Sequence, residues 1–227
     1  MKARIFLLLI AFTLAPAVFA QKKVGERLDK AAKALQEIVS SEKGLHHHIL
    51  DQAYCVMVYP GVKKLAFGIG DSYGRGALVC RKGQDMKGEW GAPVMFALDQ
   101  GSLGVQFGGT STDFVLVVVS QKGVDQVLNG KAKLGTDAAA TAGPSAAEAS
   151  TYSVTASKSD ILTYSRSKGV FAGVSLAGAI MEVDVDANTA LYSKELTPAE
   201  IVKGDLAVPT AASGLVDLLD TVSYLRK

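Results

Sequence analysis

The chain has 227 residues, with 24 Lys or Arg, 22 Asp or Glu, and a 48% share of hydrophobic residues. This length and composition suffice for one substantial hydrophobic core. The near-neutral charge leaves no basic stripe of the kind that contacts nucleic-acid phosphates, so the composition argues against a nucleic-acid-binding protein.

The first twenty residues have the pattern of a secretory signal peptide. Lys2 and Arg4 precede a short apolar stretch, and Val18 and Ala20 occupy the −3 and −1 positions of a cleavage site. No later stretch reaches the roughly 20 apolar residues that a membrane helix requires. We therefore predict cleavage after Ala20, a secreted or periplasmic protein without a transmembrane segment, and a single domain over residues 21–227.

Removing this leader changes the charge distribution. Without Lys2 and Arg4 the chain carries 22 basic and 22 acidic residues. Residues 21–64 hold eight basic and five acidic residues, so the remaining positive charge lies in the N-terminal part.

The two cysteines, Cys55 and Cys80, allow two interpretations. An exported protein meets an oxidising environment in which they can form one disulfide. The alternative is two buried free thiols that pack as small hydrophobic residues.

An amphipathic helix is predicted at the start of the mature chain. Apolar residues recur there at spacings of three and four, namely Val24, Leu28, Ala31, Ala32, Leu35, Ile38 and Val39, while basic residues fall largely on other faces. This pattern favours a helix that packs its apolar stripe on the domain over one that lies in a membrane. A second short helix is predicted over residues 47–54.

After Pro60 and Gly61 the pattern changes to short apolar runs separated by Gly, Asp and Ser, which predicts β-strands. The runs are KLAFGIG, GRGALVCR, SLGVQFGG, DFVLVVVS, ILTYSRS, VFAGVSL and AIMEVDVDA. The run from Phe114 to Val119 is apolar throughout and predicts a central strand covered on both faces. GVDQVLNG predicts a short helix, and residues 131–151 fit either strand or loop.

The C-terminal part is predicted to end in helices. In AIMEVDVDA the alternation predicts a half-exposed strand with Asp184 and Asp186 on its solvated face, followed by a turn at Asn188. Thr197-Pro198-Ala199-Glu200 is a capping box with proline at the first helical position. A last helix has the apolar stripe Leu215, Leu218, Leu219, Val222 and Leu225. Together these elements predict an α+β fold: an antiparallel-rich, barrel-like sheet with N- and C-terminal helices.

The glycine-rich stretch FGIGDSYGRGALVC, residues 67–80, raises the question of a nucleotide site. Gly68 and Gly70 match the first two positions of a dinucleotide-binding fingerprint, but Tyr73 stands at the third, and a strand pattern follows where the motif requires a helix. We interpret the stretch as a β-hairpin in which glycine allows bending or close backbone approach.

No catalytic constellation is evident. All histidines lie in the tripeptide His46-His47-His48, and consecutive helical residues point about 100° apart, so they are unsuited to one metal ion and are expected to be solvated. A serine or cysteine nucleophile would have no separate histidine base. We therefore expect no enzyme activity, no metal site and no cofactor.

Three stretches together resemble the SYLF domain family. They are AYCVMVYPGVKKLAFGIGDSYGRGALVCR, SLGVQFGGTSTDFVLVVVSQKGVDQVLNGKAKLGTDAAATAGP and ILTYSRSKGVFAGVSLAGAIMEVDVDANTALY. The resemblance covers residues 31–192 and leaves 197–227 as a C-terminal helical extension. It implies an α+β lipid-binding domain without catalytic residues. In eukaryotic members it implies phosphoinositide (phosphatidylinositol) ligands and, for some, actin as a partner.

The resemblance also implies where lipid would bind. The family's membrane contact is attributed to a basic N-terminal amphipathic helix, and the comparable segment here carries Lys22, Lys23, Arg27, Lys30 and Lys33. Further candidates are Lys63 and Lys64, in the turn before the glycine hairpin, and Arg75, which is expected with Tyr73 at the turn of the hairpin. The expected function is peripheral binding of anionic phospholipid headgroups at a membrane. The alternative is a structural or protein-interaction module of the cell envelope, which burial of Leu28, Leu35 and Ile38 would favour.

Overall fold

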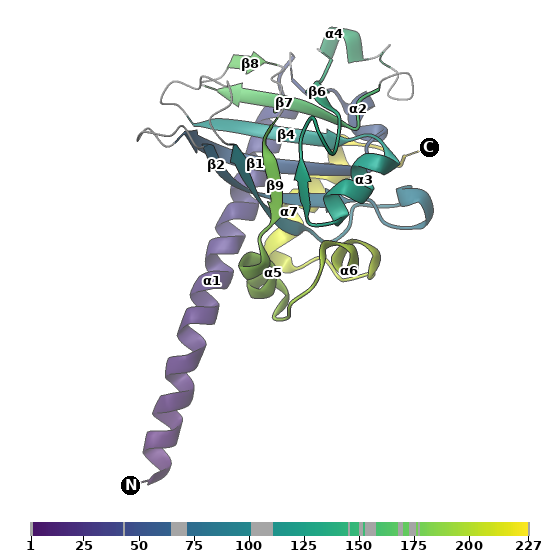
Figure 1. Ribbon diagram of the computed structural model, residues 1–227. Coiled ribbons are helices and arrows are strands. Elements are labelled where there is room, and N and C mark those ends of the chain that lie inside the picture. The colour runs from purple at the N-terminus through teal and green to yellow at the C-terminus, as the bar shows by residue number, and fades with distance from the viewer. Residues whose placement is uncertain are drawn as a thin grey trace.

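The computed structural model describes residues 2–42, 44–64, 72–100, 111–144, 146–149, 152, 158–167, 170–172, 176 and 178–226. Over these residues, nine strands form one curled, mostly antiparallel sheet of half-barrel shape, with helices at both ends of the chain (Figure 1). The predicted α+β class with an antiparallel-rich, barrel-like sheet is confirmed.

The elements follow one another as predicted in outline. The helices are α1 (Lys2–Val39), α2 (His47–Asp51), α3 (Gln121–Leu128), α4 (Ala146–Ala149), α5 (Val185–Tyr192), α6 (Pro198–Lys203) and α7 (Ser213–Val222). The strands are β1 (Cys55–Lys64), β2 (Ser72–Cys80), β3 (Val94–Gln100), β4 (Thr112–Val118), β5 (Lys131–Lys133), β6 (Ala140–Ala142), β7 (Ile161–Ser167), β8 (Val170–Ala172) and β9 (Ile180–Val183). Two 3₁₀ turns cover Gln84–Met86 and Thr210–Ala212.

The sheet has β1 and β4 near its centre. The strand order is β5-β9-β3-β2-β1-β4-β7-β6, with β8 paired to β7, and only the β6–β7 pair is parallel. On β4, Val115 and Val117 face one hydrophobic cluster while Phe114 and Leu116 face another. Because side chains alternate across a strand, both faces of the sheet are covered, as the continuous apolar run predicts.

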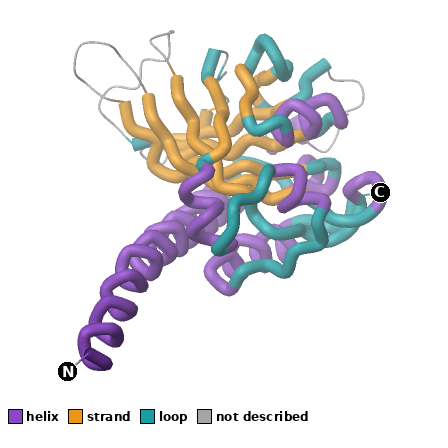
Figure 2. Tube along the Cα trace, turned by 60° about the horizontal axis from the view of Figure 1, so that its bottom comes forward, coloured by secondary structure: helices purple, strands orange, loops and turns teal. Residues whose placement is uncertain are grey.

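Helix α1 covers one face of this sheet. Its buried residues are Val24, Leu28, Ala31, Ala34, Leu35 and Ile38, and they join the cluster that contains Val56 and Val58 of β1. Figures 1 and 2 show the C-terminal half of α1 against the sheet, whereas its N-terminal half projects beyond the body of the protein. The predicted packing of the apolar stripe on the domain is confirmed.

The glycine hairpin is confirmed where the structure describes it. Strand β1 pairs antiparallel with β2, and Lys63 and Lys64 lie opposite Tyr73 and Ser72. The prediction that these two lysines lie in a turn is wrong: a register shift between Val58 and Lys63 lets β1 continue past Pro60. The expectation that Tyr73 and Arg75 lie at the turn of the hairpin is also wrong, because both belong to β2 and pair with β3. The remainder of KLAFGIG, all of SLGVQFGG and part of VFAGVSL lie outside the described residues.

Three predictions near the C-terminus are wrong. The strand ends at Val183, and the next residues form α5, because Asp184 caps this helix by accepting a hydrogen bond from the Ala187 N–H. Asn188 is therefore helical and buried, and its amide bonds both backbone groups of Met95. Leu225 lies beyond the end of α7 and is exposed, so it is not part of the apolar stripe. The capping box of Thr197 and Glu200 is confirmed.

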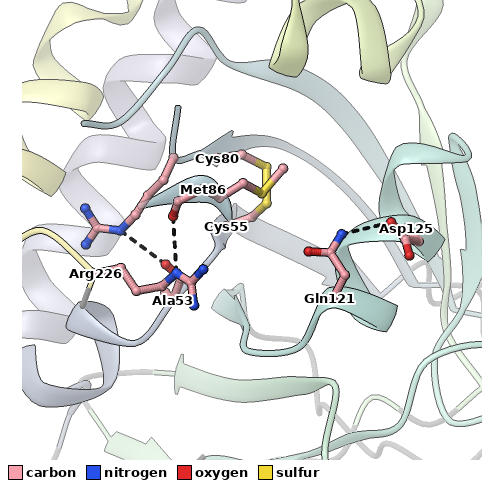
Figure 3. The surroundings of a disulfide bond; sticks show 8 residues. Ala53, Cys55, Cys80, Met86, Gln121, Asp125 and Arg226 are labelled. Atoms are coloured by element: carbon pink, nitrogen blue, oxygen red, sulfur yellow. Dashed lines mark hydrogen bonds between the residues drawn. A yellow bond between two sulfur atoms is a disulfide. The ribbon is translucent and has the colours of Figure 1, made fainter. Parts of the chain in front are cut away.

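A disulfide joins Cys55 to Cys80 across the β1–β2 pair (Figure 3). Beside it, the buried Arg81 stacks on Trp90 and donates to the carbonyl oxygens of Ala53 and Tyr224. Arg226 stacks on Tyr54 and donates to the Met86 carbonyl oxygen. These bonds hold the C-terminal segment, residues 223–226, against the end of the β1–β2 pair that carries the disulfide.

Replacement of Gly76 by alanine is predicted to destabilise the fold. A Cβ at this position would overlap the Val58 carbonyl oxygen and lie 2.6 Å from Cδ1 of Tyr59. Overpacking of this kind costs about 1–3 kcal/mol, so Gly76→Ala should lower the free energy of unfolding by that amount in urea. The matched control is Gly214→Ala in α7, where a Cβ meets nothing within 4 Å and alanine is neutral or stabilising by up to about 1 kcal/mol. Equal effects of the two substitutions would contradict the close-approach explanation.

Loss of the disulfide is predicted to destabilise the fold. The bond closes a loop with a sequence separation of 25 residues, for which the chain-entropy model gives about 3.5 kcal/mol. The Cys55→Ala/Cys80→Ala variant should therefore unfold at lower urea concentration than the oxidised wild type. Reductant should shift the wild type toward the variant and leave the variant unchanged. A wild type that is insensitive to reductant would argue against the bond.

Candidate functional site

A pocket of about 390 Å³ lies between α1 and the β1–β2 hairpin. Its lining residues are Lys23, Glu26, Arg27, Lys30, Pro60, Gly61, Lys63, Tyr73, Gly74 and Arg75. We call this set the basic groove. It brings together five of the eight residues predicted to bind lipid, from three segments of the chain.

Helix geometry explains the contribution of α1. Lys23, Arg27 and Lys30 are spaced by four and three residues, so they share one face of the helix. Burial of Leu28 and Leu35 against the sheet fixes the rotation of α1 about its axis. The apolar stripe therefore directs this basic face along the hairpin.

Backbone conformation explains the contribution of the hairpin. Gly61 has a positive φ of 61°, and its N–H donates to Asp113 at 2.8 Å, which holds the irregular part of β1. A Cβ on Gly74 would lie 2.7 Å from Cγ2 of Val62, so glycine permits the close approach of β1 and β2 here. Arg75 stacks over the ring of Tyr73 with its guanidinium carbon 5.2 Å from the ring centroid.

A carboxylate from a third element pairs with two of the groove's cations. Oδ2 of Asp184 accepts from Nη1 of Arg27 at 2.8 Å and from Nη1 of Arg75. The side chain of Asp184 is 5% exposed, that of Arg27 16% and that of Arg75 45%. Asp184 thus links α1, β2 and the start of α5 in one ion-pair network.

The network keeps Asp184 ionised. Burial alone would raise its pKa, but hydrogen bonds from Arg27, from Arg75 and from the Ala187 N–H outweigh burial and hold the pKa below its ordinary value. For Arg75, burial lowers the pKa and the hydrogen bond to Asp184 more than offsets this, so its pKa lies above the ordinary value. Asp184 and Arg75 are therefore both charged at neutral pH.

The remaining predicted site residues lie apart from the groove's lining. Lys22 and Lys33 are exposed on α1. Lys64 ends β1 opposite Ser72, and its side chain lies outside the described residues. His46 caps α2, where its Nδ1 accepts from the His48 N–H.

In the described part of the chain, no group of three or more His, Cys, Asp or Glu side chains is arranged to hold a metal ion. Over those residues, none of the helices combines the length and hydropathy that crossing a bilayer demands.

A larger cavity of about 1290 Å³, which shares no lining residue with the basic groove, lies beside α2 and the C-terminal segment. Its lining includes Tyr54, Asp160 and Tyr224. The Asp160 carboxylate accepts hydrogen bonds from Ser120 Oγ at 2.6 Å, from Lys122 Nζ at 3.2 Å and from the Ala139 N–H at 2.8 Å. The cavity therefore offers neither an excess of one charge nor a free catalytic carboxylate among these groups.

Asp184 is the functional residue that sequence reasoning missed. It was expected on a solvated strand face together with Asp186, and only Asp186 is exposed. Aspartate is a typical N-cap residue, and Asp184 directly precedes the run VDANTALY that forms α5. Pairing with Arg27 and Arg75, which are 157 and 109 residues distant in sequence, had no local signal.

Comparison with known proteins identifies relatives over most of the chain. The Ysc84 family model, described as "Las17-binding protein actin regulator", matches residues 99–222. Protein YSC84 of Saccharomyces cerevisiae is 30% identical over 204 residues, which cover 86% of this chain and 43% of that protein. An SH3 domain-containing protein of Schizosaccharomyces pombe is 32% identical over 168 residues, which cover 73% of this chain and 38% of that protein.

A human protein gives a similar match. SH3 domain-containing YSC84-like protein 1 is 27% identical over 199 residues, which cover 85% of this chain and 57% of the human protein. The chain thus spans about two fifths of the length of the yeast relatives and somewhat over half of the human one.

The Asp184 network is predicted to make stability depend on pH. Because the folded-state pKa of Asp184 is below the unfolded value of about 3.9, its contribution is complete above about pH 5 and is lost as pH falls toward the folded pKa. Asp184→Asn keeps the helix cap and removes the charge, and should cost about 2 kcal/mol at pH 7. In urea unfolding, the gap between wild type and variant should narrow from pH 7 to pH 3. A gap that stays constant would exclude this linkage.

Proposed function

The chain belongs to the Ysc84 family of SYLF domains, and we propose that it is an exported, non-enzymatic protein whose basic groove binds anionic lipid headgroups at a membrane surface. The observation that carries this proposal is the gathering of five cations in one pocket. Two carboxylates, Glu26 and Asp184, accompany them, so the groove keeps a positive excess. Such an excess attracts phosphate-bearing surfaces.

The groove supports surface attachment in preference to helix insertion. Leu28, Leu35 and Ile38 are each at most 1% exposed within the domain. For these side chains to enter a bilayer, α1 would have to leave the sheet and expose Val56 and Val58 to water, at about 1.5–3 kcal/mol for each large apolar side chain. A lysine near an anionic surface contributes only about 1 kcal/mol. The balance favours binding with α1 in place.

The hairpin side of the groove adds an amphipathic contact. Tyr73 is 40% exposed and carries Arg75 over its ring. Aromatic side chains of this kind favour the headgroup region of a bilayer, where ring and hydroxyl each find a suitable environment. The pair Tyr73–Arg75 therefore suits the same surface as the lysines.

Export is supported by two separate features. The leader pattern ends at Ala20. The chain also has a disulfide, Cys55–Cys80, and disulfides persist in oxidising compartments. An exported chain would retain the domain it shares with its relatives while meeting a different set of partners.

A second function is favoured by the burial of α1. With Leu28, Leu35 and Ile38 in the core, the fold is complete without a bilayer, which suits a structural or protein-interaction module of the cell envelope. The relatives' family description names binding of Las17 and actin regulation. On this second proposal the groove would receive an acidic protein segment.

Lipid binding is predicted to depend on the groove lysines. Removing two cations, each worth about 1 kcal/mol at an anionic surface, should weaken binding roughly thirty-fold. The Lys30→Gln/Lys63→Gln variant should therefore bind vesicles of phosphatidylserine and phosphatidylcholine correspondingly less well than the wild-type residues 21–227, measured by co-sedimentation at low salt. Added salt should reduce wild-type binding as well.

The control carries the same change of net charge elsewhere. Lys194→Gln/Lys203→Gln removes two exposed lysines outside the groove and should bind like the wild type. Equal loss in both variants would indicate diffuse charge attraction without a site. Absence of wild-type binding at low salt would reject the lipid proposal and leave the protein-interaction proposal.

A further inference from the structure

The inner end of the basic groove is already occupied by an anion of the protein itself. Asp184 is almost fully buried and places one carboxylate oxygen against both Arg27 and Arg75. Its other oxygen accepts from the Ala187 N–H at 3.2 Å. A headgroup phosphate that enters the groove meets two guanidinium groups that already have a partner.

We infer that Asp184 is the resident counter-ion of the groove, and that an incoming phosphate group binds by taking Arg75 away from it. This inference rests on the proposed binding of anionic headgroups by the same groove. It assigns Asp184 a positioning role: it holds Arg75 in place in the empty groove and limits the groove's affinity for anions.

The two arginines are not equivalent in this exchange. Arg75 is 45% exposed, lies on a strand at the groove wall and can turn toward a ligand while its ring contact with Tyr73 holds the side chain. Arg27 is 16% exposed and lies on the basic face of α1, where its lower exposure leaves it less room to turn away from Asp184. After the exchange, Asp184 keeps Arg27 and the Ala187 N–H as partners, so the buried carboxylate is never left unpaired.

Neutralising Asp184 should strengthen anion binding even though it weakens the fold. Asp184→Asn preserves shape and the N-cap acceptor while it releases both arginines and adds one positive charge to the groove. One additional cation near an anionic surface corresponds to about five-fold tighter binding. A residue with a purely structural role would lose binding and stability together, so a gain in affinity separates the two roles.

The experiment measures binding to phosphatidylserine–phosphatidylcholine vesicles over a salt series for residues 21–227. The variants are Asp184→Asn, Arg75→Gln and the two combined. The control is Asp205→Asn, which makes the same charge change at an exposed pair with Lys82 outside the groove. We expect about five-fold tighter binding and a steeper salt dependence for Asp184→Asn, weaker binding for Arg75→Gln, and a smaller gain from Asp184→Asn when Arg75 is absent. Asp205→Asn should bind like the wild type.

Each outcome is decisive. If the wild type binds and Asp184→Asn binds no better, the counter-ion role is rejected and the groove proposal stands. If neither binds, both are rejected. A second measurement needs no variant at this position: in the wild type titrated with inorganic pyrophosphate, the Nε–Hε resonance of Arg75 should shift saturably and that of Arg27 should not. The reverse order, or no shift in either, would overturn the exchange.

Discussion

The packing of α1 against the sheet is the interaction on which the rest of the structure depends. Its stripe from Val24 to Ile38 covers the face of β1 and β4 that would otherwise expose a row of valines. Since each large apolar side chain contributes about 1.5–3 kcal/mol on burial, this contact outweighs any single charged contact on the helix. It also fixes which side of α1 faces outward, and therefore where Lys23, Arg27 and Lys30 lie.

Asp184 joins the packed helix α1 to the hairpin by pairing with a cation from each, Arg27 and Arg75. It caps α5, which itself packs on the sheet through the bonds of Asn188 to Met95. From that fixed point the carboxylate reaches both the helix and the hairpin. A buried ion pair usually contributes little net stability, because desolvation offsets the attraction. Its use here lies in geometry, since it holds two guanidinium groups beside one pocket.

Much of the fold follows from local patterns in the sequence. The period of α1, the continuous apolar run of β4 and the capping box at Thr197 each have a direct physical cause in adjacent residues, and all three are present as predicted. The SYLF resemblance is likewise confirmed. Failures occur where a tertiary contact competes with a local pattern. The alternation up to Val185 reads as a strand, but the Asp184 cap and the burial of Asn188 favour a helix. The bulge that carries Lys63 along β1 depends on cross-strand contacts with Asp113 and Tyr73, which no sequence window contains.

The glycines of the hairpin show how a local sequence pattern and a tertiary contact combine. The spacing of Gly68 and Gly70 first suggests a nucleotide loop, yet a Cβ on Gly76 would overlap the Val58 backbone of β1, and a Cβ on Gly74 would crowd the side chain of Val62. That close approach brings Tyr73 and Arg75 alongside the basic face of α1. A phosphate loop uses glycine so that the backbone itself can approach the ligand. Here glycine lets one strand approach another, and the side chains at the alternate positions, Tyr73 and Arg75, line the groove. On the proposed function, glycine therefore serves anion recognition in both cases, but here recognition would fall to arginine and lysine side chains, two of which Asp184 already pairs.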